Sequence, residues 1–106
     1  MRYRLSTRAQ SDLDGIRAYT LERWGRAQWL AYYRDLARTF ERIATEPQTG
    51  RRRDAFRPGM RSVPCRAHVV FYMELGGGVI GIARILHARQ NAAALRWDEE
   101  WAGNGR

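Results

Sequence analysis

The residues with the clearest capacity for chemistry lie near the end of the chain. Arg84, His87 and Arg89 fall within six positions, and Arg61 lies in an earlier apolar segment. Guanidinium groups can clamp a phosphate, and a histidine can transfer protons because its pKa lies near neutrality. His87 has no obvious nucleophile or second base beside it in the sequence. We therefore favour a structural role for it, in which it holds a backbone carbonyl where a strand ends.

Arg84 lies between Ala83 and Ile85, in the middle of a predicted strand. Burying an arginine without a carboxylate is costly. The side chain is therefore either exposed on a functional face or paired with an acid such as Glu74, and the sequence leaves both readings open.

Metal, disulfide and dinucleotide chemistry are all disfavoured. The chain has one cysteine, Cys65, and two histidines, which is a poor basis for zinc ligation and excludes an internal disulfide. Residues 76–81 fit the glycine spacing of a dinucleotide-binding loop, but a strand follows where such a loop requires a helix. We expect no metal and no cofactor.

The basic residues are concentrated in one segment. The formal net charge is +8, and all 19 basic residues are arginines. Residues 47–66 contain six of them and only one acidic residue, Asp54. The six are Arg51, Arg52, Arg53, Arg57, Arg61 and Arg66. This concentration suggests an anionic partner, either nucleic acid or an acidic protein segment, whereas for any single arginine a solvated, solubilising role is the favoured reading.

The spacing of apolar residues predicts two helices, near 7–24 and 27–45. Gly25 separates them and Pro47 ends the second, so the helices must fold back as an antiparallel hairpin. Four aromatic residues surround the turn between them: Trp24, Trp29, Tyr32 and Tyr33. Most fit a core role, but four are more than a tight turn needs, and an interaction surface at this tip is the alternative.

The remaining elements predict a small sheet. Strands are expected at 3–5, 60–65, 68–75 and 79–87, with the last two joined by a glycine turn and 47–59 left as loop. The predicted fold class is α+β, with an N-terminal antiparallel helical hairpin packed on a mainly antiparallel sheet in the order β-α-α-β-β-β. Only the C-terminal tail is left to cover the opposite sheet face, so we expect function on that exposed face.

The length favours a single domain over residues 1–90, followed by a short helical turn and polar tail over 91–106. No apolar stretch reaches the roughly 20 residues of a membrane span, and the N-terminus does not have the pattern of a secretory signal. We expect a cytoplasmic protein.

Over about residues 2–91 the chain resembles the ParE toxins of the ParE/RelE superfamily. The resembling features, in order, are the helix start at 6–13, Trp24-Gly25, Tyr32-Tyr33, Glu46-Pro47, Gly59-Met60-Arg61, Val70-Phe71-Tyr72 and the segment 82–90. The last segment is the most specific, because it ends like the family in a hydrophobic strand, an Arg, Leu-His and a basic residue.

The resemblance implies a RelE/ParE-like fold and a bacterial type II toxin–antitoxin system. ParE proteins bind DNA gyrase and trap it on cleaved DNA. An acidic ParD-like antitoxin neutralises them in a hetero-oligomer, through a disordered segment that folds on binding. Expected antitoxin contacts are Trp24, Trp29, Tyr33, Arg51, Arg52, Arg53, Arg57 and Arg61. Expected target contacts are Arg84, His87 and Arg89.

The related RelE toxins, which cut mRNA in the ribosome, are the alternative. Their branch uses lysines, arginines and a C-terminal tyrosine, whereas this chain has no lysine and no tyrosine after Tyr72. Arginine is a poor general base because its pKa exceeds 12. A ribonuclease would have to rely on Arg61, Arg84, His87 and Arg89. We therefore predict a gyrase-binding inhibitor rather than an enzyme.

Overall fold

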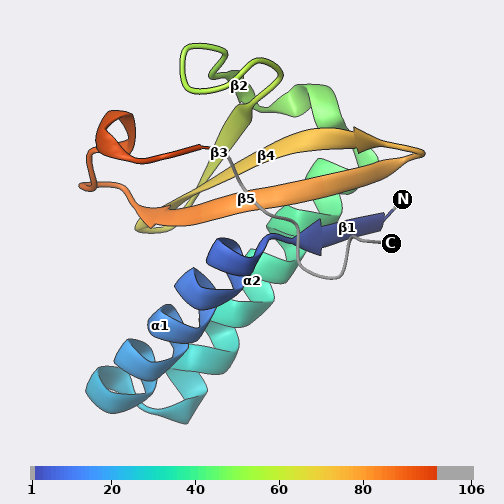
Figure 1. Cartoon of the computed structure of the whole chain (residues 1–106). Coiled ribbons are helices and arrows are strands. Elements are labelled where there is room, and N and C mark those ends of the chain that lie inside the picture. The colour runs from blue at the N-terminus through green and yellow to red at the C-terminus, as the bar shows by residue number, and fades with distance from the viewer. Residues whose placement is uncertain (1, 98–106) are drawn as a thin grey trace.

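The computed structural model describes residues 2–97 as two helices and a five-stranded sheet (Figure 1). Most of the predicted polar tail, residues 98–106, lies outside the described residues. The elements in chain order are β1 (Arg2–Leu5), α1 (Thr7–Trp24), α2 (Arg26–Thr45), the 3-10 helix η1 (Pro47–Thr49), β2 (Arg51–Arg52), β3 (Arg61–Cys65), β4 (His68–Gly76), β5 (Val79–His87) and the 3-10 helix η2 (Ala92–Ala94). The predicted α+β fold is confirmed.

The sheet has the order β1-β5-β4-β3-β2, with β1 parallel to β5 and every other pair antiparallel. The short strand β2 was not expected, because residues 47–59 have no apolar alternation. It forms because Arg51 and Arg52 pair with the start of β3, which leaves Pro64 on the open edge where a missing N–H is tolerated.

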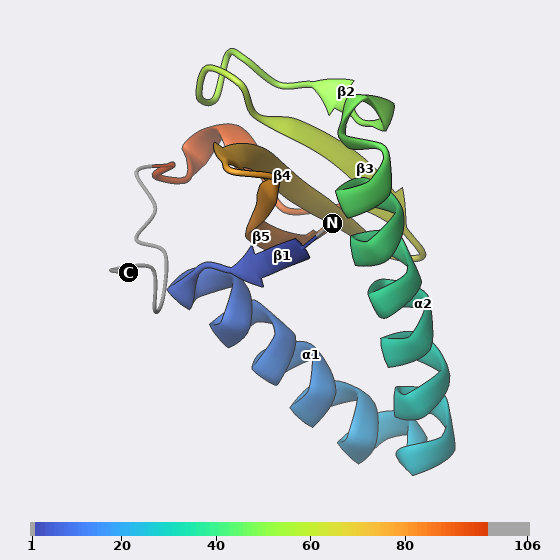
Figure 2. The same cartoon turned by 90° about the vertical axis from the view of Figure 1, so that its right-hand side faces the viewer.

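The helical hairpin meets the sheet at one end only. Gly25 has a φ of 90°, a conformation that favours glycine, and it lets α2 turn back directly after α1. Figures 1 and 2 show the base of the hairpin against the sheet and its tip projecting away from it. No helix among residues 2–97 is long and apolar enough to cross a membrane.

Ser6 fixes the start of α1 to the sheet. Its Oγ accepts the backbone N–H of Ala9 at 2.9 Å, as a helix N-cap does, and donates to the carbonyl of Ala83 at 2.7 Å. The first turn of α1 is therefore held beside β5, where the parallel pairing with β1 ends.

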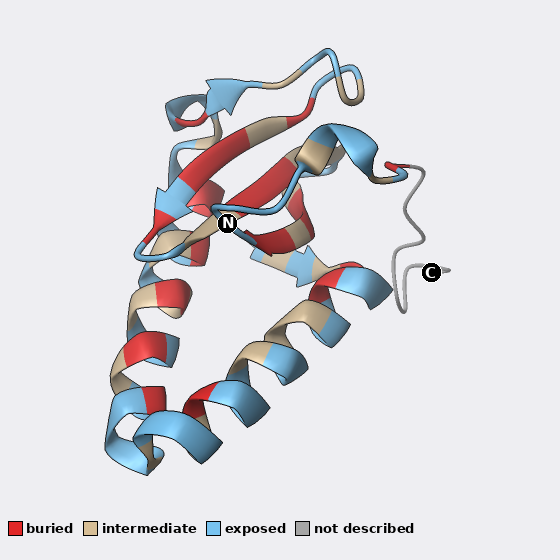
Figure 3. Ribbon diagram, turned by 90° about the vertical axis from the view of Figure 1, so that its left-hand side faces the viewer, coloured by how far each residue is buried: buried red, intermediate tan, exposed pale blue. Residues whose placement is uncertain are grey.

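Buried residues form two clusters, one on each face of the sheet. Figure 3 shows that the buried positions are concentrated in β3, β4 and β5, with others along the helices. The helix-facing cluster contains, among others, Leu36, Phe40, Ile43, Val70, Tyr72, Ile80, Ile82 and Ile85. The opposite cluster contains Met60, Phe71, Ala83, Leu86 and Trp97, with Phe56 and Leu95 packed against it.

The exposed sheet face that the sequence suggested is therefore not found. Trp97 is buried, its ring stacks on Phe56 at 5.5 Å, and its carbonyl accepts a hydrogen bond from Arg57. Residues after β5 and the loop before β3 together cover this side. The segment was predicted to be a polar tail because charged residues flank Trp97 in the sequence.

Candidate functional site

A cleft of about 750 Å³ opens between the helical hairpin and the end of the β4–β5 pair. Its walls come from α1, α2, the turn between β3 and β4, and the end of β5. Lining residues include Ile16, Tyr19, Trp24, Tyr32, His68 and His87. The site therefore combines aromatic and aliphatic walls with both histidines of the chain.

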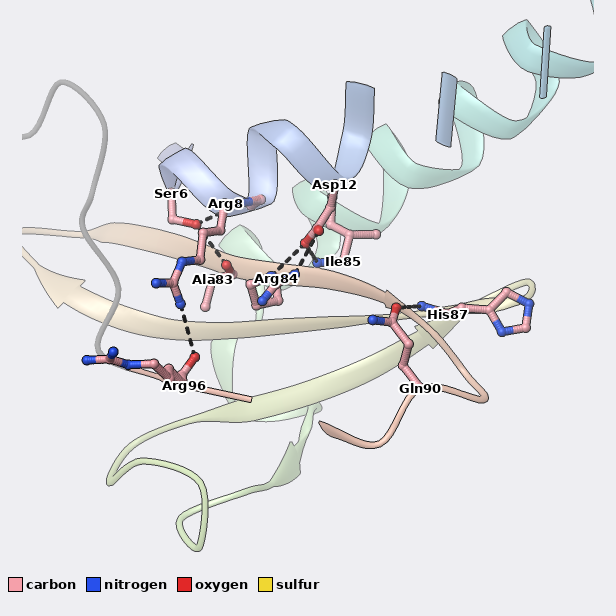
Figure 4. A network of polar contacts seen from close by, with 10 residues as sticks. Ser6, Arg8, Asp12, Ala83, Arg84, Ile85, His87, Gln90 and Arg96 are labelled. Atoms are coloured by element: carbon pink, nitrogen blue, oxygen red, sulfur yellow. Dashed lines mark hydrogen bonds and ion pairs between the residues drawn. The ribbon is translucent and has the colours of Figure 1, made fainter. Parts of the chain in front are cut away.

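An ion pair joins α1 to β5 at the inner side of this cleft (Figure 4). Arg84 donates from Nε and Nη2 to the two carboxylate oxygens of Asp12, at 2.8 and 2.9 Å. The same carboxylate accepts the backbone N–H of Ile85 at 2.9 Å. The Asp12 carboxylate thus bonds to the part of the β5 edge that does not pair with β1. The Arg84 guanidinium compensates its charge.

This pair decides between the two readings of Arg84. The side chain is paired, but its partner is Asp12 and not Glu74, which instead accepts a hydrogen bond from Gln48. The prediction of Glu74 was wrong because Glu74 pairs with Ile80, near the glycine turn, while Arg84 faces Phe71 further along the hairpin.

The two histidines lie opposite each other at the open end of the β4–β5 pair. His68 and His87 are paired in the strand register, and their ring centroids are 5.4 Å apart with the edge of one ring toward the other. Tyr32 of α2 forms a hydrogen bond with Nδ1 of His68. His87 accordingly does have a second titratable base beside it, contrary to our expectation. Its Nδ1 accepts the backbone N–H of Arg89 and does not hold a carbonyl.

The pKa values of Tyr32 and His68 shift in the direction that keeps each side chain uncharged. Burial raises the pKa of Tyr32 to about 12. Burial also lowers the pKa of His68, and proximity to His87 adds to this effect while Asp12 opposes it. Near neutral pH, His68 is therefore a neutral ring that accepts a hydrogen bond from a neutral tyrosine.

The arginine-rich segment is organised differently. Arg53 donates to the Ser62 hydroxyl, Arg57 to the Trp97 carbonyl, and Arg61 to the Gly50 carbonyl and to Gln48. Arg66 bonds to Asp35 at 2.6 Å and lines the cleft. Arg51 and Arg52 are exposed on β2, where Arg52 contacts Asp54, and Arg66 is also exposed.

The aromatic residues at the hairpin tip divide into two groups. Trp24 is 67% exposed and Tyr33 is 44% exposed, so both are accessible to a partner. Trp29 is 8% exposed and its ring packs at a tilt against that of Tyr33, and Tyr32 is also buried. Trp29 therefore supports the tip from inside.

The chain matches known proteins over most of its length. The profile of the family described as ParE toxin of type II toxin-antitoxin system, parDE, matches residues 3–92. The chain belongs to the ParE toxin family. Toxin ParE1 of Caulobacter vibrioides is 44% identical over 92 residues, which is 87% of this chain and 94% of the relative. Toxin ParE1 of Mycobacterium tuberculosis is 40% identical over 90 residues, 85% of this chain and 92% of the relative.

A solved structure supports the ParE fold independently. The chromosomal ParDE TA system from P. aeruginosa contains a chain that superposes with a TM-score of 0.67 at 21% identity, covering 82% of this chain and 95% of that one. The predicted family and the toxin–antitoxin context are confirmed, and a ParE toxin of a ParDE system implies an antitoxin partner.

Sequence reasoning missed three residues of the ParE cleft: Asp12, Tyr32 as a partner of histidine, and His68. Asp12 is 72 residues away from Arg84, and no local pattern connects them. His68 was accessible to prediction, because strands at 68–75 and 79–87 joined by a three-glycine turn bring their outer ends together. No cluster of three or more metal-binding side chains occurs within the described part of the chain.

Proposed function

We propose that this ParE toxin inhibits DNA gyrase by binding it, and that an acidic ParD-like antitoxin neutralises the toxin. The observation that carries the binding role is the separation of the candidate catalytic residues. Arg61 and His87 are aligned with Tyr72 and His68 of β4, four residues apart, which corresponds to about 13 Å along the strand. Arg61 is bonded to the Gly50 carbonyl and to Gln48, and Arg84 is bonded to Asp12, so these candidates are engaged at separate places in the structure.

The antitoxin contacts that the surface supports best are Trp24 and Tyr33 at the tip and Arg51 and Arg52 on β2. Exposed aromatic residues contribute most of the energy in many interfaces, and exposed charges accelerate association. Arg53, Arg57 and Arg61 can contribute charge, but their donors are partly used within the loop. Arg84, His87 and Arg89 remain the proposed target contacts, of which His87 and Arg89 are exposed.

The direct test uses purified gyrase. Toxin added to a supercoiling reaction should reduce supercoiling or accumulate cleaved DNA, and toxin preincubated with antitoxin should have neither effect. Toxin alone should leave DNA and RNA intact. Unimpaired supercoiling at toxin concentrations that arrest growth in cells would contradict gyrase as the target.

Ribosome-dependent mRNA cleavage is a second candidate, favoured by one observation. The facing imidazoles of His68 and His87 are a possible acid–base pair of the kind that RNA cleavage requires. The variant His87→Ala separates the two functions. A ribonuclease would lose about 10²–10⁴-fold in cleavage rate while still folding. A gyrase inhibitor would show no RNA cleavage in either form.

A further inference from the structure

We propose that the cleft beside His68 and His87 receives an acidic side chain of the antitoxin, and that antitoxin binding is coupled to proton uptake by this histidine pair. The inference rests on the proposed neutralisation by an acidic antitoxin. It adds a specific binding site and a pH dependence to it.

Both rings present an unused hydrogen-bond donor. Nδ1 of His87 accepts the N–H of Arg89 at 3.1 Å, so the neutral ring carries its proton on Nε2. The Tyr32 hydroxyl is bonded to Nδ1 of His68, and with the tyrosine assigned as the donor, that ring also carries its proton on Nε2. Among residues 2–97, no acceptor contacts either Nε2.

Two such donors suit one carboxylate. The ring centroids are 5.4 Å apart, and a carboxylate has two acceptor oxygens, so one carboxylate beside the rings can accept from both histidines. The remaining walls are apolar or aromatic, including Ile16, Tyr19 and Trp24. A peptide segment with an acidic residue between hydrophobic residues matches this combination.

A nucleic-acid phosphate fits the same cleft less well. Phosphate backbones are tracked by several free cationic side chains. Here the only arginine of the lining is Arg66, which is bound to Asp35, and the lining also contains the carboxylate of Asp12. The charge that a ligand meets therefore comes mainly from the histidines themselves.

The groups around the pair determine the sign of the pH dependence. Asp12 faces His68 from α1, Tyr32 and Asp35 lie on α2, Arg66 is on the β3–β4 turn, and Arg89 follows His87. The Asp12 and Asp35 charges are each compensated by an arginine, so an added carboxylate is a new negative charge. It stabilises a protonated imidazole, so the complex binds more protons than the free toxin and affinity rises as pH falls from 8 to 6.

The test is calorimetric titration of the whole toxin with its cognate antitoxin at pH 8, 7 and 6, in two buffers of different ionisation enthalpy. We expect uptake of up to one proton and a Kd that falls by up to about tenfold per pH unit. His87→Asn keeps an acceptor near Nδ1 but removes Nε2, so it should weaken binding at pH 6 and reduce proton uptake. His87→Gln keeps a neutral amide near the Nε2 position, so it should retain more affinity than His87→Asn but take up no proton there.

Controls identify the source of the protons. The chain has only two histidines, so a toxin carrying both His68→Asn and His87→Asn has no imidazole, and residual proton uptake then comes from groups other than the histidine pair. Arg17→Gln changes an exposed charge on α1 outside the cleft lining and should leave the proton count unchanged. If His68→Asn unfolds, His87→Asn alone still decides, because His87 is exposed.

The possible outcomes separate the two proposals. Antitoxin that does not bind at any pH contradicts the proposed neutralisation itself. Tight binding with the same Kd at pH 8 and 6 and in both His87 variants contradicts only the histidine site. Loss of binding of a DNA duplex or of inorganic phosphate in His87→Asn, with antitoxin binding unchanged, would overturn the choice of a carboxylate in favour of a phosphate.

Discussion

Two arginine–aspartate pairs in this molecule have the same Nε–Oδ2 distance of 2.8 Å but lie in different surroundings. Arg84 and Asp12 join α1 to β5 and are 14% and 15% exposed, whereas Arg52 and Asp54 in the arginine-rich loop are 72% and 42% exposed. The Arg84–Asp12 pair is largely shielded from water, so water replaces a lost partner poorly there, whereas it readily does so in the exposed pair. Distance alone is therefore a poor guide to what either pair contributes.

The largest loss of folding stability is expected from Asp12→Ala. It leaves the Arg84 guanidinium without this carboxylate and the Ile85 N–H without its acceptor, which should lower the free energy of unfolding by about 3–5 kcal/mol. Urea denaturation followed by circular dichroism measures this. Replacing both partners, as Asp12→Leu with Arg84→Met, should restore part of the loss because no charge is left buried. A loss below about 1 kcal/mol in Asp12→Ala would remove the contrast between the pairs.

A smaller loss is expected from Gly50→Ala, in the loop region. The N–H of Gly50 donates to the Tyr72 hydroxyl, which donates to the Pro47 carbonyl, both at 2.8 Å. An alanine methyl would lie 2.3 Å from that hydroxyl oxygen, so the loop must move, at about 1–3 kcal/mol. Gly15→Ala is the control, because nothing lies within 4 Å of the new methyl and helix propensity should stabilise it. Equal stability of the two variants would show that the loop yields freely.

The cleft around His68 and the arginine-rich loop around Asp54 should also lose stability in different pH ranges. The folded-state pKa of His68 is lowered by burial, so between that value and the ordinary 6.5 the unfolded chain binds more protons. Its contribution is complete above about pH 6.5 and declines as pH falls toward the folded value. Urea midpoints measured from pH 7.5 to 5 should therefore fall, and His68→Asn should flatten this decline.

Asp54 changes stability in the same sense but in a lower pH range. The N–H of Gly59, and then Arg52, hold its pKa below the ordinary range. Its contribution is therefore present above about pH 4 and lost only as pH falls through the lowered value. Asp54→Asn should leave the midpoints between pH 5 and 7.5 unchanged, and a change there comparable to that of His68→Asn would contradict the assignment.

The smallest effect is expected from Arg52→Ala. Because the pair with Asp54 is exposed, the urea midpoint at pH 7 should shift by no more than the experimental error. Association with antitoxin at low salt should nevertheless slow, since Arg52 is among the exposed charges of β2. Unchanged association across a salt series would show that β2 does not face the antitoxin.

Features that depend on neighbouring residues were predictable. The spacing of apolar residues gave both helices, Gly25 gave the hairpin, and the glycine turn paired β4 with β5. Features that depend on distant contacts were not. The Asp12–Arg84 pair connects the two ends of the chain, and the parallel pairing of β1 with β5 does the same.

The arginine-rich segment shows a second reason for failure. A charge count treats its six arginines alike, but whether a guanidinium is exposed or binds a carbonyl depends on the loop around it. Gly50, Ser62 and Trp97 supply the acceptors that occupy Arg61, Arg53 and Arg57. The count therefore overstated the free positive charge of this surface.

Trp97 has a consequence for where the protein can be shortened. The match to the ParE family ends at residue 92, five residues before this side chain. A chain trimmed to the family boundary would lack the ring that contacts Phe56 and Phe71, at 5.5 and 4.9 Å, and would present an apolar sheet surface to water. Such surfaces promote self-association. The shortest soluble form should therefore extend past the region shared with relatives.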